Sequence, residues 1–353
     1  MENNENTIGI IPDSCGNSGY SAKLMRKSST ANSIILIIFT IFMIGGSILT
    51  TYIAEAFVNK DSEYYSSLCM LLSMLIQSFG GVSLALFVNK KTTAGKEAEP
   101  TRSLFRKPQQ SSWWIIRWIF IVLFFIYATN YATSFIFMFI ENITGIKLVQ
   151  TDFSADDNAL SGIVNIICIT FMAPFFEEVL VRGAMLGNSK KYGTWSAAIA
   201  TGLFFGLLHM NYPQVPFAAV MGFFSAFLVL KTKSIFPSIL VHFIVNSIGG
   251  IQSLFVGRVD AEAIMAGDIS AAMENPVPFI ILMLIGLLIL GLLGIGLIFF
   301  IIEIVKFRDS FKLEKVYPEV SEGKKLLHYF SSPLTVALAL FYITMTVLNA
   351  LPE

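Results

Sequence analysis

Long apolar stretches recur along the whole chain, and they constrain its fold more than any other feature. About 20 consecutive apolar residues are enough for a helix to cross ~30 Å of hydrocarbon. The stretches that reach or approach this length are 33–58, 65–89, 113–140, 159–186, 194–210, 214–230, 234–256, 278–303 and 333–350. Only helices or a closed barrel satisfy the backbone inside a bilayer, and these stretches are too long for barrel strands. The sequence therefore predicts an all-α, polytopic transmembrane helical bundle of about nine spans.

The composition supports one membrane domain with a polar extension. Hydrophobic residues make up 55% of the chain and charged residues 14%, with a mean hydropathy of +0.69. Residues 1–32 are polar and predict a disordered cytoplasmic tail, which leaves 33–353 as a single membrane domain, and 90–112 reads as a flexible linker. The chain carries no basic patch of the kind that binds nucleic acid, so the lipid bilayer is its expected surrounding and no nucleic-acid partner is expected.

Basic residues are distributed unequally between alternate loops. Nineteen of the 24 Lys and Arg lie in 1–32, 90–112, 190–191, 231–233 and 306–325, whereas the opposite loops hold three. Cytoplasmic loops of membrane proteins carry an excess of Lys and Arg. This asymmetry predicts a cytoplasmic N-terminus and supports the division into nine spans.

Six polar residues interrupt the apolar stretches. They are Glu177, Glu178, Arg182, His209, His242 and Asn246. An ionisable side chain at membrane depth costs from about 2.5 to more than 10 kcal/mol, so such residues usually face a cavity and mark function. Two acids, an arginine, two histidines and an amide at helical spacing therefore indicate a functional site.

The first three of these residues divide into a pair and a free acid. Glu178 and Arg182 lie four residues apart and share one helix face, which predicts a structural ion pair. Glu177 points about 100° away and is left free of that pair. Pro174 precedes them and favours a kink that would open a cavity. In the alternative interpretation, both acids serve only to neutralise the arginine.

The histidines and the asparagine complete the pattern. His242 and Asn246 share a helix face, and neutral His and Asn suit the stabilisation of an oxyanion, although they could instead bond to each other. His209 alone would be typical of an interfacial group. Gly202 and Gly206, however, let another helix approach closely and would bring His209 near the other polar residues.

In this order on successive helices, the motifs Glu-Glu-x-x-x-Arg, Phe-x-x-x-His and His-x-x-x-Asn resemble those of the CPBP family of intramembrane endopeptidases, which comprises CAAX proteases and bacteriocin-processing (Abi) proteins. The three motifs correspond to Glu177–Arg182, Phe205–His209 and His242–Asn246, and the resemblance covers a catalytic core of about 159–250. It implies that Glu177 and His209 activate water and that His242 and Asn246 hold the oxyanion. It also implies a membrane-associated or prenylated peptide or protein as substrate. An active site facing the cytoplasm of a bacterial plasma membrane is the expected location.

Two questions stay open at this level. Glu177, His209 and His242 could supply a His₂Glu zinc site, but no His-Glu-x-x-His helix preorganises two histidines, so a metal-free glutamate mechanism is preferred and no cofactor is assigned. A non-catalytic peptide-binding immunity or scaffold protein and a proton-coupled transporter are the alternative functions. Transporters are commonly built from inverted repeats, and the sequence shows none.

Overall fold

The computed structural model describes residues 19–149, 158–260, 263–264 and 267–351, and its regular structure there is entirely helical. The α-helices are α1 (Ala22–Glu55), α2 (Tyr65–Leu75), α3 (Ser83–Asn89), α4 (Thr93–Glu97), α5 (Ser112–Thr144), α6 (Ala159–Ile166), α7 (Ala173–Glu178), α8 (Leu186–Ser189), α9 (Thr194–Leu207), α10 (Gln214–Thr232), α11 (Phe236–Val256), α13 (Ile269–Glu274), α14 (Pro276–Lys306), α15 (Glu322–Phe330) and α16 (Pro333–Ala350). Three π-helical segments, η1 (Ile76–Val82), η3 (Ile167–Met172) and η4 (Val179–Met185), interrupt these helices, and η2 (Thr101–Leu104) and η5 (Arg308–Phe311) are short 3₁₀ turns.

The prediction of an all-α polytopic bundle is confirmed. Eight helices of the described chain are long and apolar enough to cross a membrane. The ninth expected span corresponds to α9, which has 14 residues. At about 1.5 Å per residue α9 covers roughly 21 Å, less than the hydrocarbon thickness. The crossing by α9 therefore stays a prediction.

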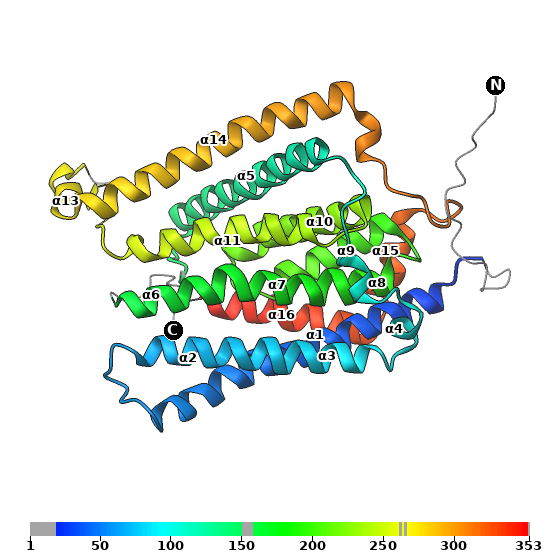
Figure 1. Ribbon diagram of the computed structural model, residues 1–353, viewed down its shortest axis with the longest axis horizontal. Helices are drawn as coiled ribbons and strands as arrows, with labels where there is room; N and C mark the ends of the chain where they lie inside the picture. The colour runs from blue at the N-terminus through cyan, green and yellow to red at the C-terminus, as the bar shows by residue number, and fades with distance from the viewer. Residues whose placement is uncertain (1–18, 150–157, 261–262, 265–266, 352–353) are drawn as a thin grey trace.

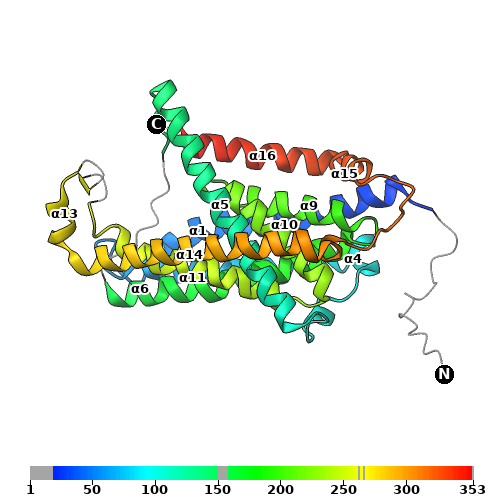
Figure 2. The same cartoon turned by 90° about the horizontal axis from the view of Figure 1, so that it is seen from above.

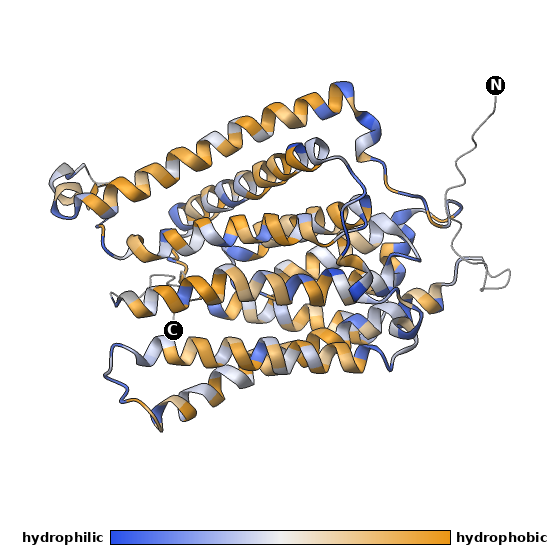
Figure 3. Ribbon diagram, in the orientation of Figure 1, coloured by the Kyte–Doolittle hydropathy of each residue, from blue (hydrophilic) through white to orange (hydrophobic). Residues whose placement is uncertain are grey.

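The helices lie side by side, with α14 and α5 at one edge of the bundle and α1, α2 and α3 at the opposite edge (Figure 1, Figure 2). The central group is α7, α9, α10 and α11 (Figure 1). Apolar residues fill the middle of the helices, whereas polar residues gather toward the ends of the bundle (Figure 3). This banding is what a bundle needs in order to sit in a bilayer.

The basic segments of the sequence meet at one end of this bundle, which we call the basic end. The segment 98–110 crosses this end and is anchored there, because the Gln109 N–H donates to the Thr232 carbonyl (2.8 Å) and Arg106 Nε donates to the Lys233 carbonyl (2.7 Å). Lys190 also forms an ion pair with Glu99 at 2.7 Å. The interpretation of 90–112 as a flexible linker is therefore wrong, because its polar residues form contacts with two other loops.

The start of the membrane domain also differs from the expectation. Of the predicted tail 1–32, residues 1–18 lie outside the described residues, and 22–32 belong to α1, which Ser21 caps through its side chain. Asn32 is buried and donates hydrogen bonds to Ser189 Oγ (3.0 Å) and the Tyr329 hydroxyl (2.9 Å). Ser28, Ser29 and Asn32 are therefore buried against protein partners, which composition alone does not distinguish from exposure to solvent.

Asn188 of α8 extends this buried polar network. Its amide nitrogen donates to Asn32 Oδ1 (2.8 Å) and to Asn89 Oδ1 (2.9 Å). Together with Tyr329 of α15, the three amides join α1, α3, α8 and α15. We call these four residues the amide network.

Candidate active site

The two glutamates lie on a helix that is continuous from Leu160 to Ser189 but is not α-helical throughout. The short helix α7, which carries both of them, has the π-helical segments η3 before it and η4 after it. Pro174 cannot donate a backbone hydrogen bond, and the wider turn before it accommodates the ring, with the Ala173 N–H bonded to the Cys168 carbonyl. Single π turns inside α-helices occur frequently at functional sites.

Glu178 and Arg182 form an ion pair that is closed to solvent. Arg182 Nη2 lies 2.9 Å from Glu178 Oε1, and both side chains have 0% exposure. The guanidinium also lies over the ring of Phe205, 4.8 Å from its centroid. A charge in such surroundings is stable only with its partner, so each of these two side chains needs the other.

His242 of α11 joins the pair from the neighbouring helix. Its Nδ1 lies 3.2 Å from Glu178 Oε1, and its side chain is 2% exposed. An ionised carboxylate only accepts hydrogen bonds, so Nδ1 carries the hydrogen in this contact. Glu178 thereby fixes both the orientation of the imidazole and the position of one of its protons.

Glu177 lies on the other side of the same imidazole. Its Oε2 is 3.8 Å from His242 Nε2, and its side chain is 17% exposed. This oxygen is buried and accepts no hydrogen bond from the described residues. Glu177 therefore offers an uncommitted carboxylate oxygen directly beside an imidazole nitrogen.

Phe205 contacts both histidines of the predicted site. The Phe205 ring centroid lies 5.3 Å from the His209 ring and 5.5 Å from the His242 ring, edge-on to both. His209 Nδ1 lies 2.9 Å from the Phe205 carbonyl, which only accepts, so Nδ1 carries the hydrogen and the neutral ring keeps a lone pair on Nε2. The sequence indicated Phe205 as part of a motif but did not indicate that its ring contacts both histidines.

Asn246 lies one turn beyond His242 and faces the same helix as the glutamates. Its amide nitrogen donates to the carbonyl of Ile169, within η3, at 2.9 Å. A side-chain amide has two N–H groups, so a second donor is left. His242 and Asn246 thus bond to the glutamate helix, whereas the sequence left open a bond between the two.

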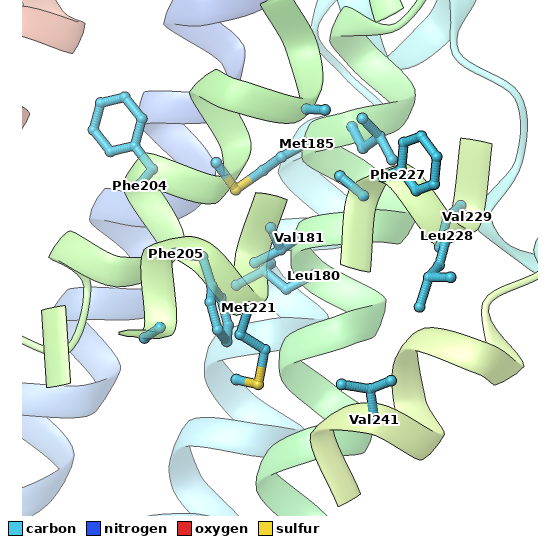
Figure 4. Close-up of a cluster of buried hydrophobic side chains, with 14 of the residues drawn as sticks. Leu180, Val181, Met185, Phe204, Phe205, Met221, Phe227, Leu228, Val229 and Val241 are labelled. Atoms are coloured by element: carbon cyan, nitrogen blue, oxygen red, sulfur yellow. The ribbon is translucent and has the colours of Figure 1, made fainter. Parts of the chain in front are cut away.

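Close packing of α9 against α10 sets the position of the Phe205–His209 turn. A Cβ added to Gly202 would lie 2.5 Å from the backbone nitrogen of Phe223, and one added to Gly206 would lie 2.5 Å from the Val215 carbonyl oxygen. The predicted close approach at these glycines is confirmed, and the approaching helix is α10. The apolar side chains around this contact form the core next to the site, including Leu180, Phe205, Met221 and Val241 (Figure 4).

The candidate zinc ligands Glu177, His209 and His242 do not form one metal-binding group in this arrangement. Within the described part of the chain, no three His, Cys, Asp or Glu side chains come close enough together to hold one. Glu177 and His242 are neighbours, and the ring of Phe205 packs against both His242 and His209.

The structure thus brings Glu177, Glu178, Arg182 and His242 together, with Asn246 a turn away and His209 against the ring of Phe205. The contact that sequence reasoning missed is the one between His242 and Glu178. The sequence held no signal for it, because the two residues lie on different helices.

A polytopic helical membrane protein with a carboxylate–imidazole site between its helices is the class that fold and site define. Residues 159–248, about a quarter of the chain, match the family described as Type II CAAX prenyl endopeptidase Rce1-like. The resemblance to the CPBP, or CAAX protease, family is therefore confirmed, and this match supports intramembrane protease activity in general. No curated protein and no solved structure matches the chain.

Proposed function

We propose that this protein is an intramembrane endopeptidase in which Glu177 activates the water that cleaves a peptide bond. The observation that carries the proposal is the arrangement around His242. Glu178 Oε1 lies 3.2 Å from His242 Nδ1, and the free Oε2 of Glu177 lies 3.8 Å from His242 Nε2. A purely structural neutralisation of Arg182 would not need this second, uncommitted acid.

The chemistry begins with Glu177 and His209. The Glu177 carboxylate takes a proton from water as the water oxygen bonds to the carbonyl carbon, and the same proton later passes to the leaving amine as the C–N bond breaks. His209 keeps its Nε2 lone pair because its Nδ1–H is bonded to the Phe205 carbonyl. That lone pair suits His209 as a second acceptor for the water proton.

His242 and Asn246 serve the oxyanion that forms at the carbonyl carbon. Asn246 gives the N–H that is not bonded to Ile169. His242 uses Nδ1–H on Glu178, so the oxyanion role requires a hydrogen on Nε2 as well, and His242 in this role is an imidazolium. Its positive charge balances the net negative charge of Glu177, Glu178 and Arg182.

The proposed substrate is a membrane-associated peptide or protein, with a prenylated C-terminus as the first candidate. The description of the matched family names a CAAX prenyl endopeptidase. The site also lies within helices apolar enough to be in the bilayer, where a lipid-modified peptide is held at high local concentration. The proposed location is a plasma membrane with the basic end in the cytoplasm, as the distribution of Lys and Arg predicts.

The test uses the full-length protein in liposomes and a quenched peptide that ends in a farnesylated cysteine and three further residues. Glu177→Gln should lower turnover at least ~10²-fold, because general base catalysis contributes about 10²–10⁴. Thr170→Val is the matched control, since it removes a buried hydroxyl of the same helix that has no hydrogen-bond partner in the described chain.

Equal turnover by wild type and Glu177→Gln would refute the assignment of Glu177. Binding of the peptide without cleavage by wild type would favour a scaffold or immunity function. If only the substrate is wrong, mass spectrometry of membrane peptides from cells with wild type or Glu177→Gln should still show products that require Glu177.

A further inference from the structure

A cavity lies at the basic end, lined by none of the catalytic-motif residues. Its volume is about 550 Å³, and it is formed by the start of α5, the end of α14, η5 and the end of α10. Four basic side chains line it, Arg117, Lys231, Lys306 and Arg308, together with a single acid, Asp309. We propose that this cavity binds the phosphate group of an anionic membrane lipid.

The positive charge of the cavity favours an anionic ligand. Neither Lys306 nor Arg308 forms a hydrogen bond or ion pair with any described residue, and both are exposed at the rim. Asp309 is already paired with Lys312. Basic pockets between transmembrane helices are typical sites for anionic lipid headgroups, and each Lys or Arg near such a surface contributes about 1 kcal/mol.

The wall of the cavity holds a preorganised hydrogen-bond donor. Ser310 Oγ accepts hydrogen bonds from Trp114 Nε1 (2.7 Å) and from Trp118 Nε1 (3.0 Å). Both contacts use the lone pairs of this oxygen, so the hydroxyl hydrogen remains available. Ser310 is 9% exposed, and it lines the cavity, so that hydrogen can be donated to a phosphate oxygen.

Two of the four basic side chains, Arg117 and Lys231, are bonded to other parts of the protein. Arg117 is paired with the buried Glu303 at 2.8 Å, and Lys231 donates to the Lys312 carbonyl at 3.0 Å. Glu303 neutralises Arg117 from behind and does not line the cavity. The net positive charge therefore comes from Lys231, Lys306 and Arg308, which a phosphate diester can approach from the rim.

An apolar surface beside the cavity favours a lipid over free phosphate as the ligand. The cavity continues into an apolar surface on α14, where Val305 is 71% exposed, and Trp113 of α5 is 56% exposed beside Phe299. Trp residues at such positions mark the membrane–water interface. A headgroup in the cavity would place its acyl chains along this surface, whereas inorganic phosphate would gain nothing from it.

The test measures lipid binding to the purified full-length protein by native mass spectrometry. The probes are phosphatidylglycerol, phosphatidylcholine as the neutral lipid, and inorganic phosphate as competitor. The double variant Lys306→Gln/Arg308→Gln should bind phosphatidylglycerol about 30-fold more weakly than wild type, the loss that follows from removing two basic side chains. Lys90→Gln/Lys315→Gln, which removes two exposed cations without described partners, is the matched control and should bind like wild type.

A third variant, Lys306→Arg/Arg308→Lys, keeps the charge and should bind like wild type. It distinguishes loss of charge from loss of folding as the cause of weaker binding by the double variant. Equal binding of phosphatidylglycerol by the double variant and its control would overturn the proposal, as would equal binding of phosphatidylcholine by wild type. Displacement of the lipid by millimolar inorganic phosphate would overturn the assignment to a lipid and assign the cavity to free phosphate.

Discussion

The division of labour between the adjacent glutamates gives the sharpest prediction. Glu178→Gln removes the charge that balances Arg182 and keeps the shape of the side chain. Arg182 has 0% exposure, and its Nε and Nη1 have no hydrogen-bond partner in the described chain, so the guanidinium would retain only the face of Phe205 and a neutral amide. Breaking a buried ion pair in this way costs about 3–5 kcal/mol.

For a chain of this length we expect roughly 2 °C of melting temperature per kcal/mol, so Glu178→Gln should melt about 6–10 °C below wild type. Glu177→Gln should shift melting by little more than ~1 °C, because the partly exposed Glu177 side chain leaves Oε2 without a hydrogen bond in the described chain. The two variants differ by one position on the same helical turn and are therefore matched controls for each other.

Cys168 provides the assay. It is a free thiol with 0% exposure in the same helix, so a thiol-reactive fluorogenic dye reports its release on unfolding. Cys15→Ser and Cys69→Ser would leave Cys168 as the single reporter. The double variant Glu178→Gln/Arg182→Met should recover part of the loss, because no uncompensated charge remains. Equal melting of the two single variants would refute the assignment of Glu178 to structure and Glu177 to catalysis.

Three further predictions concern topology, metal and packing. A cysteine introduced at Lys96 should resist an impermeant thiol reagent on intact cells, whereas one at Ser270 should react, and the reverse pattern would invert the orientation. Elemental analysis of the purified protein should find no stoichiometric zinc in wild type; one zinc per chain that disappears in His242→Ala would establish the metal mechanism instead. Gly202→Ala should destabilise the protein through its contact with α10, whereas Gly286→Ala, with nothing within 4 Å of the added Cβ, should be neutral when both are compared in the melting assay.

The positions of the helices could be predicted from the sequence because a run of consecutive apolar residues by itself indicates a membrane span. Each expected span corresponds to a helix or helical run, within a few residues except at α1. The beginning of α1 was missed because Ser28 and Asn32 are polar residues with buried partners. Hydropathy cannot separate that situation from exposure to solvent.

The site could be predicted only where its contacts are local. Glu178 and Arg182 are four residues apart, and helix geometry alone puts them together. The contact between Glu178 and His242 joins residues 64 positions apart, so it depends on how α11 packs against α7. Pro174 indicated a local irregularity before α7, but the π-helical form of η3 and η4 was not predicted.

The amide network has a consequence for the order in which the chain is assembled. Asn32 enters the membrane with the first helix, but its partners Asn188 and Tyr329 follow 156 and 297 residues later. Unpaired amides are costly in an apolar setting, and polar side chains can draw helices together there. During synthesis α1 therefore carries unsatisfied polar groups until α15 arrives. Only a chain synthesised through α15 can complete the network. An incompletely synthesised chain therefore keeps unpaired polar groups in α1.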